Sequence, residues 1–245
     1  MQLNLEPKQG ARAEATDSGW KGLYKVGGIT VLIAILLPPA EIVIGLLPGV
    51  ERASDATVTA VDWFMLLHNH WFLGLRNLGL LNMVGAALLV PTFLALYSAL
   101  RRDNEAFAAL GTVLFLIGIT VYLASNRAFT TLSLSHQYIS ATTDAQRSLL
   151  VAAGQAMLAE GQSRAGLLLT EFASLVTSVV MLRGRIFSRA TGCAGVLGNA
   201  LLMVVEIAFL PVSSEAGMVV AASGGLSLMI WYFLMGRRLL QLERL

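Results

Sequence analysis

Long runs of apolar residues, separated by short polar stretches, dominate the chain. About 20 mostly apolar residues in helical conformation cross the hydrocarbon core of a bilayer, and each of these runs reaches that length. We therefore predict an all-α fold, a polytopic membrane helix bundle with six transmembrane helices. Their ranges are 27–47, 72–100, 107–133, 162–182, 190–211 and 216–236.

Polar segments flank the apolar region at both ends. Residues 1–26 are polar and mixed in charge, without the basic, apolar and small-residue order of a cleaved signal peptide. We expect them to form a cytoplasmic N-terminal segment, followed by one transmembrane domain over 27–236 and a basic cytoplasmic tail over 237–245. Pro38 and Pro39 predict a kink in the first span.

Two polar connections are long enough to form helices of their own. In 54–68, Ser54 or Asp55 fits a helix cap, and apolar residues recur behind it at helical spacing. In 143–160, the sequence TDAQ fits a capping box. We expect two short amphipathic helices at the outer surface, serving either as connectors packed on the bundle or as a lid over a cavity.

Lysine and arginine residues are distributed asymmetrically over the connections. Positive residues are enriched in cytoplasmic loops, and with the N-terminus inside only Arg52 and Arg147 of the 17 Lys and Arg residues lie in outer loops. We therefore expect a multi-pass protein of the cytoplasmic (inner) membrane with both termini in the cytoplasm. The residues on the cytoplasmic side are Lys8, Arg12, Lys21, Lys25, Arg101, Arg102, Arg183, Arg185, Arg189, Arg237, Arg238 and Arg244.

Composition agrees with lipid as the surrounding solvent. The chain is 56% hydrophobic and 13% charged, with a mean hydropathy of +0.70, whereas about a quarter of the residues of a soluble domain are charged. A formal net charge of +2 gives no reason to expect nucleic acid as a partner. The single cysteine, Cys193, excludes an intrachain disulfide.

Ionisable residues occur within or at the ends of the predicted spans, all in the outer half of the bilayer or near its midplane. Such groups avoid lipid, face the bundle interior and pair with one another or line water. We predict a polar cluster inside the bundle, nearly open to the outside, in which Arg76 meets a carboxylate. The candidate residues are Glu41, Arg76, Asn77, Arg127, Arg164, Glu171 and Glu206.

Three interpretations of this cluster remain open. The leading hypothesis is a binding site for a small molecule, an ion or a lipid headgroup; arginines would suit a carboxylate or phosphate, and glutamates a cation. The alternative is a structural or accessory subunit in which the charges form interhelical pairs or extend to the headgroups. A membrane enzyme with a carboxylate or metal site is the third. Glu171 and Glu206 are least able to reach the headgroups, and Ser174 continues the helical face of Glu171 as Asn199 shares that of Glu206.

No cofactor is expected from the residues present. No lysine lies in a span, as retinal would need, and no paired histidines lie there to hold haem. His68, His70 and His136 with Asp62 are weak candidates for a zinc site at the outer mouth. The preferred interpretation is that these histidines belong to an interfacial aromatic belt, so that the chain has no metal site.

Small residues recur along the last predicted span. Gly224 and Gly225 lie among alanines and serines within 217–227. Such stripes let helices approach closely. We expect this face to pack within the fold or to form a homo-oligomer.

Three stretches carry a family resemblance: LYKVGGITVLIAILLPPAEIVIG, FLGLRNLGLLNMVGAALLVPTFLALYSALRR and RGRIFSRATGCAGVLGNALLMV. In this layout the chain, over most of residues 22–240, resembles a bacterial family of six-span membrane proteins described only as a domain of unknown function, DUF4386. The resemblance implies a compact six-helix bundle in the bacterial cytoplasmic membrane. It implies no activity.

Overall fold

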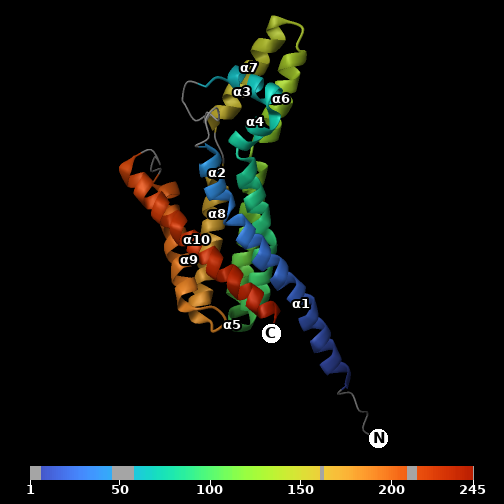
Figure 1. Cartoon of the computed structure of the whole chain (residues 1–245), viewed down its shortest axis with the longest axis vertical. Coiled ribbons are helices and arrows are strands. Elements are labelled where there is room, and N and C mark those ends of the chain that lie inside the picture. Colours follow the sequence, from blue (N-terminus) through green and yellow to red (C-terminus); the bar gives the residue numbers. More distant parts are fainter. Residues whose placement is uncertain (1–6, 46–57, 161–162, 209–213, 245) are drawn as a thin grey trace.

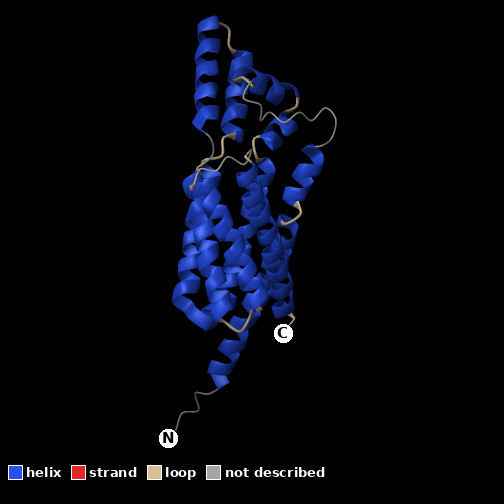
Figure 2. Cartoon of the chain, turned by 90° about the vertical axis from the view of Figure 1, so that its left-hand side faces the viewer, coloured by secondary structure: helices blue, strands red, loops and turns tan. Residues whose placement is uncertain are grey.

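The computed structural model describes residues 7–45, 58–160, 163–208 and 214–244, with side chains from Trp20 onward. These residues are helical almost throughout and contain no strand (Figure 2), which confirms the predicted all-α fold. The helices are α1 Pro7–Ala34, α2 Leu37–Gly45, α3 Ala60–Asn69, α4 Trp71–Asn77, α5 Leu80–Ala124, α6 Ala128–Ser140, α7 Asp144–Glu160, α8 Arg164–Arg183, α9 Arg189–Ile207 and α10 Glu215–Glu243.

The longest helix, α5, consists of two antiparallel arms. Asn104 has non-helical backbone angles (φ −158°, ψ 95°), and its side chain accepts a hydrogen bond from the amide of Phe107 (3.2 Å). The rings of Phe93 and Phe115 stack with centroids 3.5 Å apart, which requires the chain to reverse between them. We call residues 80–103 the first arm and residues 105–124 the second arm.

The long helices form a closed ring. Around it α1 packs on the first arm of α5, the second arm packs on α8, α8 on α9, α9 on α10, and α10 returns to α1 (Figure 1). The described residues include five helical segments long and apolar enough to cross a membrane, and the longest contains the α5 reversal. The chain therefore has the architecture of an all-α membrane bundle. The five segments are Trp20–Ile44, Leu80–Ser140, Asp144–Arg183, Arg189–Ile207 and Glu215–Glu243.

The structure differs from three predicted spans at points that hydropathy does not register. The span 72–100 is interrupted at Gly79, whose φ of 90° lies in the left-handed region that favours glycine. The span 107–133 is interrupted after Ala124, and α6 begins only at Ala128. The span 27–47 breaks between α1 and α2, where the two prolines predict a kink.

Four further helices, α3, α4, α6 and α7, pack together beyond the ring, and we call them the outer cap. The outer cap lies at the end of the molecule opposite the described N- and C-terminal ends, and α6 and α7 stand upright along its long axis (Figures 1 and 2). Phe64 forms the centre of the outer cap, since the residue is fully buried. The centroid of its ring lies 5.4 Å from that of Tyr138, and its main-chain carbonyl accepts a hydrogen bond from Ser135 Oγ (2.7 Å).

The two helices expected at the outer surface are α3 and α7, with differences in detail. Ser54 and Asp55, the expected caps, lie outside the described residues; Thr59 caps α3 instead. In α7, Thr143 Oγ1 accepts from the Gln146 amide (3.2 Å) as the capping box predicts. However, α7 does not lie flat, because it leads back from the tip of α6 into α8 (Figure 1).

Glycines allow the ring helices to approach closely. A Cβ placed on Gly166 of α8 would lie 2.7 Å from the Tyr122 amide nitrogen on the second arm, and one on Gly118 would lie 2.8 Å from the Thr170 amide nitrogen. In the stripe of small residues on α10, Gly224 packs against α9, whereas a Cβ on Gly225 would have nothing within 4 Å. The stripe thus contributes to packing within the fold; a homo-oligomer through it stays a prediction.

We expect Gly118→Ala and Gly166→Ala each to lower the free energy of unfolding by about 1–3 kcal/mol, because the added methyl forces the second arm and α8 apart. Gly225→Ala is the matched control, since the same methyl meets open space and alanine favours the helix by up to about 1 kcal/mol. Thermal unfolding of the three variants in one detergent checks this. Equal melting temperatures for all three would contradict the close approach.

Candidate functional site

A cavity of about 250 Å³ lies inside the ring, on the side of the outer cap. Both arms of α5 and each of the other four ring helices contribute to its wall, and most lining residues are apolar. One lining residue from each, in chain order, is Ala34, Asn82, Ile119, Glu171, Asn199 and Tyr232.

Aromatic side chains form the end of the cavity that is farther from the outer cap. Phe115 lines the cavity and stacks on Phe93, which in turn meets the edge of Trp231 at 6.5 Å. Phe93 and Trp231 are fully buried. This cluster separates the cavity from the end of the bundle at which α10 ends.

Glu171 of α8 supplies the only carboxylate among the residues that line this cavity. Its Oε2 atom is buried and has no hydrogen-bond partner in the described part of the chain. Buried polar atoms are nearly always hydrogen-bonded, because losing water without a replacement partner costs free energy. An oxygen in this position is therefore suited to accept a hydrogen bond from a bound molecule.

The hydroxyl groups on either side of Glu171 have already used their hydrogens. Thr170 Oγ1 donates to the Leu167 carbonyl and Ser174 Oγ donates to the Thr170 carbonyl, each at 2.7 Å. Asn199 Nδ2 donates one of its two hydrogens to the Gly195 carbonyl, also at 2.7 Å. The two hydroxyl groups therefore retain acceptor capacity, and the Asn199 amide retains its oxygen and one N–H. Together with Glu171 they favour a ligand group that donates, such as an amine, an ammonium or a hydroxyl.

Arg164 and Glu206 form an ion pair at the cap side of this cavity, without lining it. Arg164 Nε lies 3.9 Å from Glu206 Oε2, and Arg164 Nη1 donates to the Glu206 carbonyl at 3.4 Å. The pair connects the beginning of α8 to the end of α9.

Arg76 lies in a separate place between the outer cap and α2. It is buried, with 7% of its surface exposed; its Nη2 donates to the main-chain carbonyl of Glu41 (3.0 Å) and its Nη1 to Asn77 Oδ1 (2.8 Å). The expected carboxylate partner is thus replaced by a main-chain carbonyl in the middle of α2.

Arg127 lies in a third place, at the start of α6, and its Nη1 donates to the Met157 carbonyl of α7. The seven candidate residues therefore do not form one cluster. Of these seven residues, only Glu171 lines the cavity. Ser174 and Asn199, which share helical faces with candidates in the sequence, do line it; Tyr232 was missed, because a lone tyrosine in an apolar span gives no signal.

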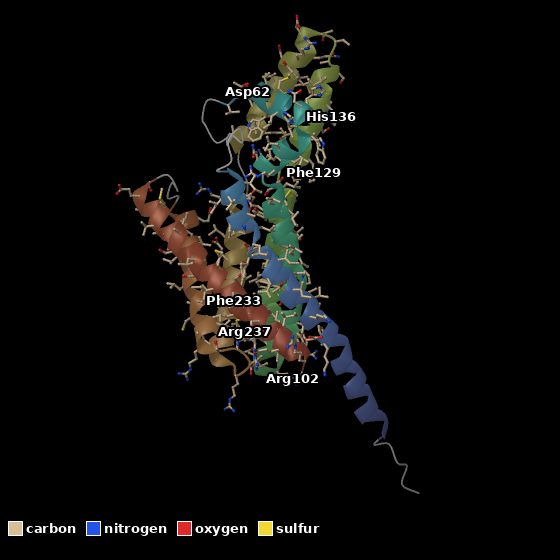
Figure 3. The ribbon with its side chains drawn as sticks, in the orientation of Figure 1. Asp62, Arg102, Phe129, His136, Phe233 and Arg237 are labelled. Carbon is tan, nitrogen blue, oxygen red and sulfur yellow. The ribbon has the colours of Figure 1, made fainter. Side chains whose placement is uncertain are left out.

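The four weak metal candidates remain in the outer cap. Asp62 on α3 and His136 on α6 are labelled there in Figure 3, and His68, His70 and His136 are exposed. Among the described residues no group of three or more metal-binding side chains comes together. Asp62 instead accepts from the Thr59 amide (2.8 Å) and hydroxyl (2.6 Å). These hydrogen bonds, the hydroxyl bond first, lower the pKa of Asp62.

The fold is an all-α membrane bundle with a cavity inside its ring, which we call the central cavity. A family model, the domain of unknown function DUF4386, matches residues 26–236. The chain belongs to this family. No curated protein and no solved structure matches the chain.

We expect the Asp62 carboxyl to titrate below the usual aspartate range, because the Thr59 hydrogen bonds favour the ionised form. Because the pKa of Asp62 is lower in the folded than in the unfolded protein, its ionised carboxylate stabilises the folded outer cap at pH values above the unfolded pKa. This contribution is lost as the pH falls through the folded pKa. The carboxyl ¹³C shift of Asp62 followed against pH in micelles measures it. Thr59→Val should raise the midpoint and Thr59→Ser should not; an unchanged midpoint in Thr59→Val would contradict the assignment.

Proposed function

We propose that this DUF4386 protein binds a small amphiphilic molecule in the central cavity, with an amine, ammonium or hydroxyl group of that molecule donating to Glu171. The observation that carries the proposal is the buried Oε2 of Glu171, which has no partner among the described residues. A bound donor would supply the hydrogen bond that this oxygen lacks.

The apolar lining supports an amphiphilic rather than a wholly polar ligand. Leu89, Leu202 and Leu228 line the cavity beside the aromatic cluster, so the remainder of the ligand meets hydrocarbon. A cavity of about 250 Å³ is just below the roughly 300–1,000 Å³ of sites for drug-sized molecules. The ligand is therefore small, or it inserts only one end.

The positions of the arginines argue against an anionic ligand in this cavity. Arg76, Arg127 and Arg164 do not line it, and each donates to a main-chain carbonyl elsewhere. The Glu171 carboxylate, the one charged group among the lining residues, would repel a carboxylate or a phosphate. Of the ligand classes considered from sequence, a group that carries positive charge or donates hydrogen bonds fits best.

We further propose six crossings of the bacterial cytoplasmic membrane, with both termini in the cytoplasm and the outer cap outside. The reversal of α5 at Asn104 divides the longest apolar segment into two arms, which supports six crossings. Arg102 and Arg237 both lie at the end of the bundle away from the outer cap (Figure 3). The positive-inside rule assigns that end to the cytoplasm.

A structural or accessory role is the second candidate function. Arg164 joins α8 to α9 and Arg76 joins the outer cap to α2, so these two charges have roles that need no ligand. This candidate leaves the Glu171 oxygen without an explanation. The two functions therefore differ at Glu171.

Alkyl chains with different head groups test the ligand class in nanodiscs. We expect octylamine to raise the melting temperature of the wild type and of Glu206→Gln, since Glu206 does not line the cavity, and octanoate to raise neither. Glu171→Gln should bind octylamine roughly tenfold to a hundredfold more weakly, because a hydrogen bond to a charged group is lost. Native mass spectrometry of the same samples detects any molecule retained from the cell. Equal octylamine binding by Glu171→Gln, or no binding by the folded wild type, would favour the structural role.

The proposed orientation is tested with single cysteines in a Cys193→Ser background. Thr142→Cys at the exposed tip between α6 and α7 should react with a membrane-impermeant maleimide in intact spheroplasts. Glu105→Cys, exposed at the reversal of α5, should react only after lysis. The opposite labelling pattern would invert the topology.

A further inference from the structure

A second cavity, of about 440 Å³, lies between the second arm of α5 and α8, at the end of the bundle away from the outer cap. It shares no residue with the central cavity. We call it the inner groove. Its wall has an apolar part on the helices and a charged part where α5 reverses and α8 ends.

The apolar part follows one face of α8. Leu175, Val176 and Val179 recur at helical spacing and line the inner groove together with Phe107 of the second arm. Phe107 is 50% exposed, so this part of the groove is not filled by the protein's own side chains. In a bilayer such a surface is in contact with acyl chains.

The charged part contains two arginines without partners in the described structure. Arg183 and Arg185 line the inner groove, are exposed, and form no hydrogen bond or ion pair within the described residues. The Asp103 carboxylate also lines the groove and packs against Gly184. Two cations and one carboxylate leave the groove net positive.

Two neighbouring arginines at the same end are used within the fold. Arg238 Nε donates to the Ile186 carbonyl (2.7 Å), and Arg101 lies over the Trp20 ring at 5.0 Å from its centroid. Arg238 and Arg101 thus contribute to the packing of the chain. The side chains of Arg183 and Arg185 make no such contact within the described residues.

We infer that the inner groove binds an anionic phospholipid of the adjacent leaflet, with its phosphate between Arg183 and Arg185 and an acyl chain along Val176, Val179 and Phe107. Guanidinium groups recognise phosphate through paired hydrogen bonds, and basic pockets between membrane helices suit anionic headgroups. The apolar wall favours a lipid over free phosphate. This inference is independent of the ligand proposed for the central cavity.

The test compares lipid retention by the full-length protein in nanodiscs of equal phosphatidylglycerol and phosphatidylcholine. Native mass spectrometry counts each lipid retained on the wild type. We expect Arg183→Gln/Arg185→Gln to lower the preference for phosphatidylglycerol roughly tenfold. The matched control, Arg189→Gln/Arg237→Gln, removes the same charge from exposed positions outside the groove and should change the preference by less than about twofold.

A second variant tests the apolar part without touching the arginines. Val179→Trp fills the groove and should also abolish the preference for phosphatidylglycerol, although both cations remain. If the double arginine variant does not fold, Arg185→Gln and Val179→Trp decide by the same criterion.

Two results would overturn the inference. An equal loss in the control variant would mean that lipid senses only the overall surface charge. Displacement of phosphatidylglycerol by inorganic phosphate, with Val179→Trp behaving as wild type, would mean that the groove binds a free anion. Neither result bears on octylamine binding at Glu171, so the two proposals fail separately.

Discussion

Close contact between helix backbones at glycine is the constraint on which this structure depends. Lipid surrounds apolar helices as readily as another helix does, so association within a bilayer relies on van der Waals packing rather than on the hydrophobic effect. Gly118 and Gly166 bring the second arm to α8, and Gly198 and Gly224 bring α9 to α10. A ring closed by such contacts holds its helices at fixed distances, and larger side chains then determine where its interior is filled. Phe93 and Trp231 fill the interior of the ring on the side of the central cavity away from the outer cap. At the level of Glu171 the side chains leave the cavity open.

Much of this fold follows from hydropathy, because lipid permits few alternatives to the helix. The α5 reversal, for example, falls at the charged stretch around Asn104 between two predicted spans. The break at Gly79 could not be predicted in the same way, since apolar residues continue on both sides of it, and the break after Ala124 is marked only by the short polar stretch Ser125, Asn126 and Arg127. They depend on local geometry: a left-handed glycine, and an Asn126 side chain that donates to the Leu78 carbonyl and accepts from the Ala128 amide.

The candidate site was only partly predictable for a related reason. Glu171 could be singled out, because a carboxylate deep in a span cannot reach the headgroups. The expectation that Arg76 meets a carboxylate was wrong, since its partner across the helices is the main-chain carbonyl of Glu41. Every residue carries such a carbonyl, so no pattern of side chains announces it. Arg127 and Arg164 likewise donate to carbonyls, which explains why one expected cluster became three separate contacts.

Partners within the fold then separate two kinds of charge in this protein. Arg76 and Arg164 join neighbouring elements, Arg76 through a main-chain carbonyl of α2 and Arg164 through the Glu206 carboxylate of α9. Glu171 and the pair Arg183 and Arg185 lie beside cavities and lack such partners in the described residues. Charges of the first kind stabilise the packing that creates the cavities. Those of the second kind make no such contacts in the described residues, and their opposite signs at the two cavities are the reason why we propose a different class of ligand for each.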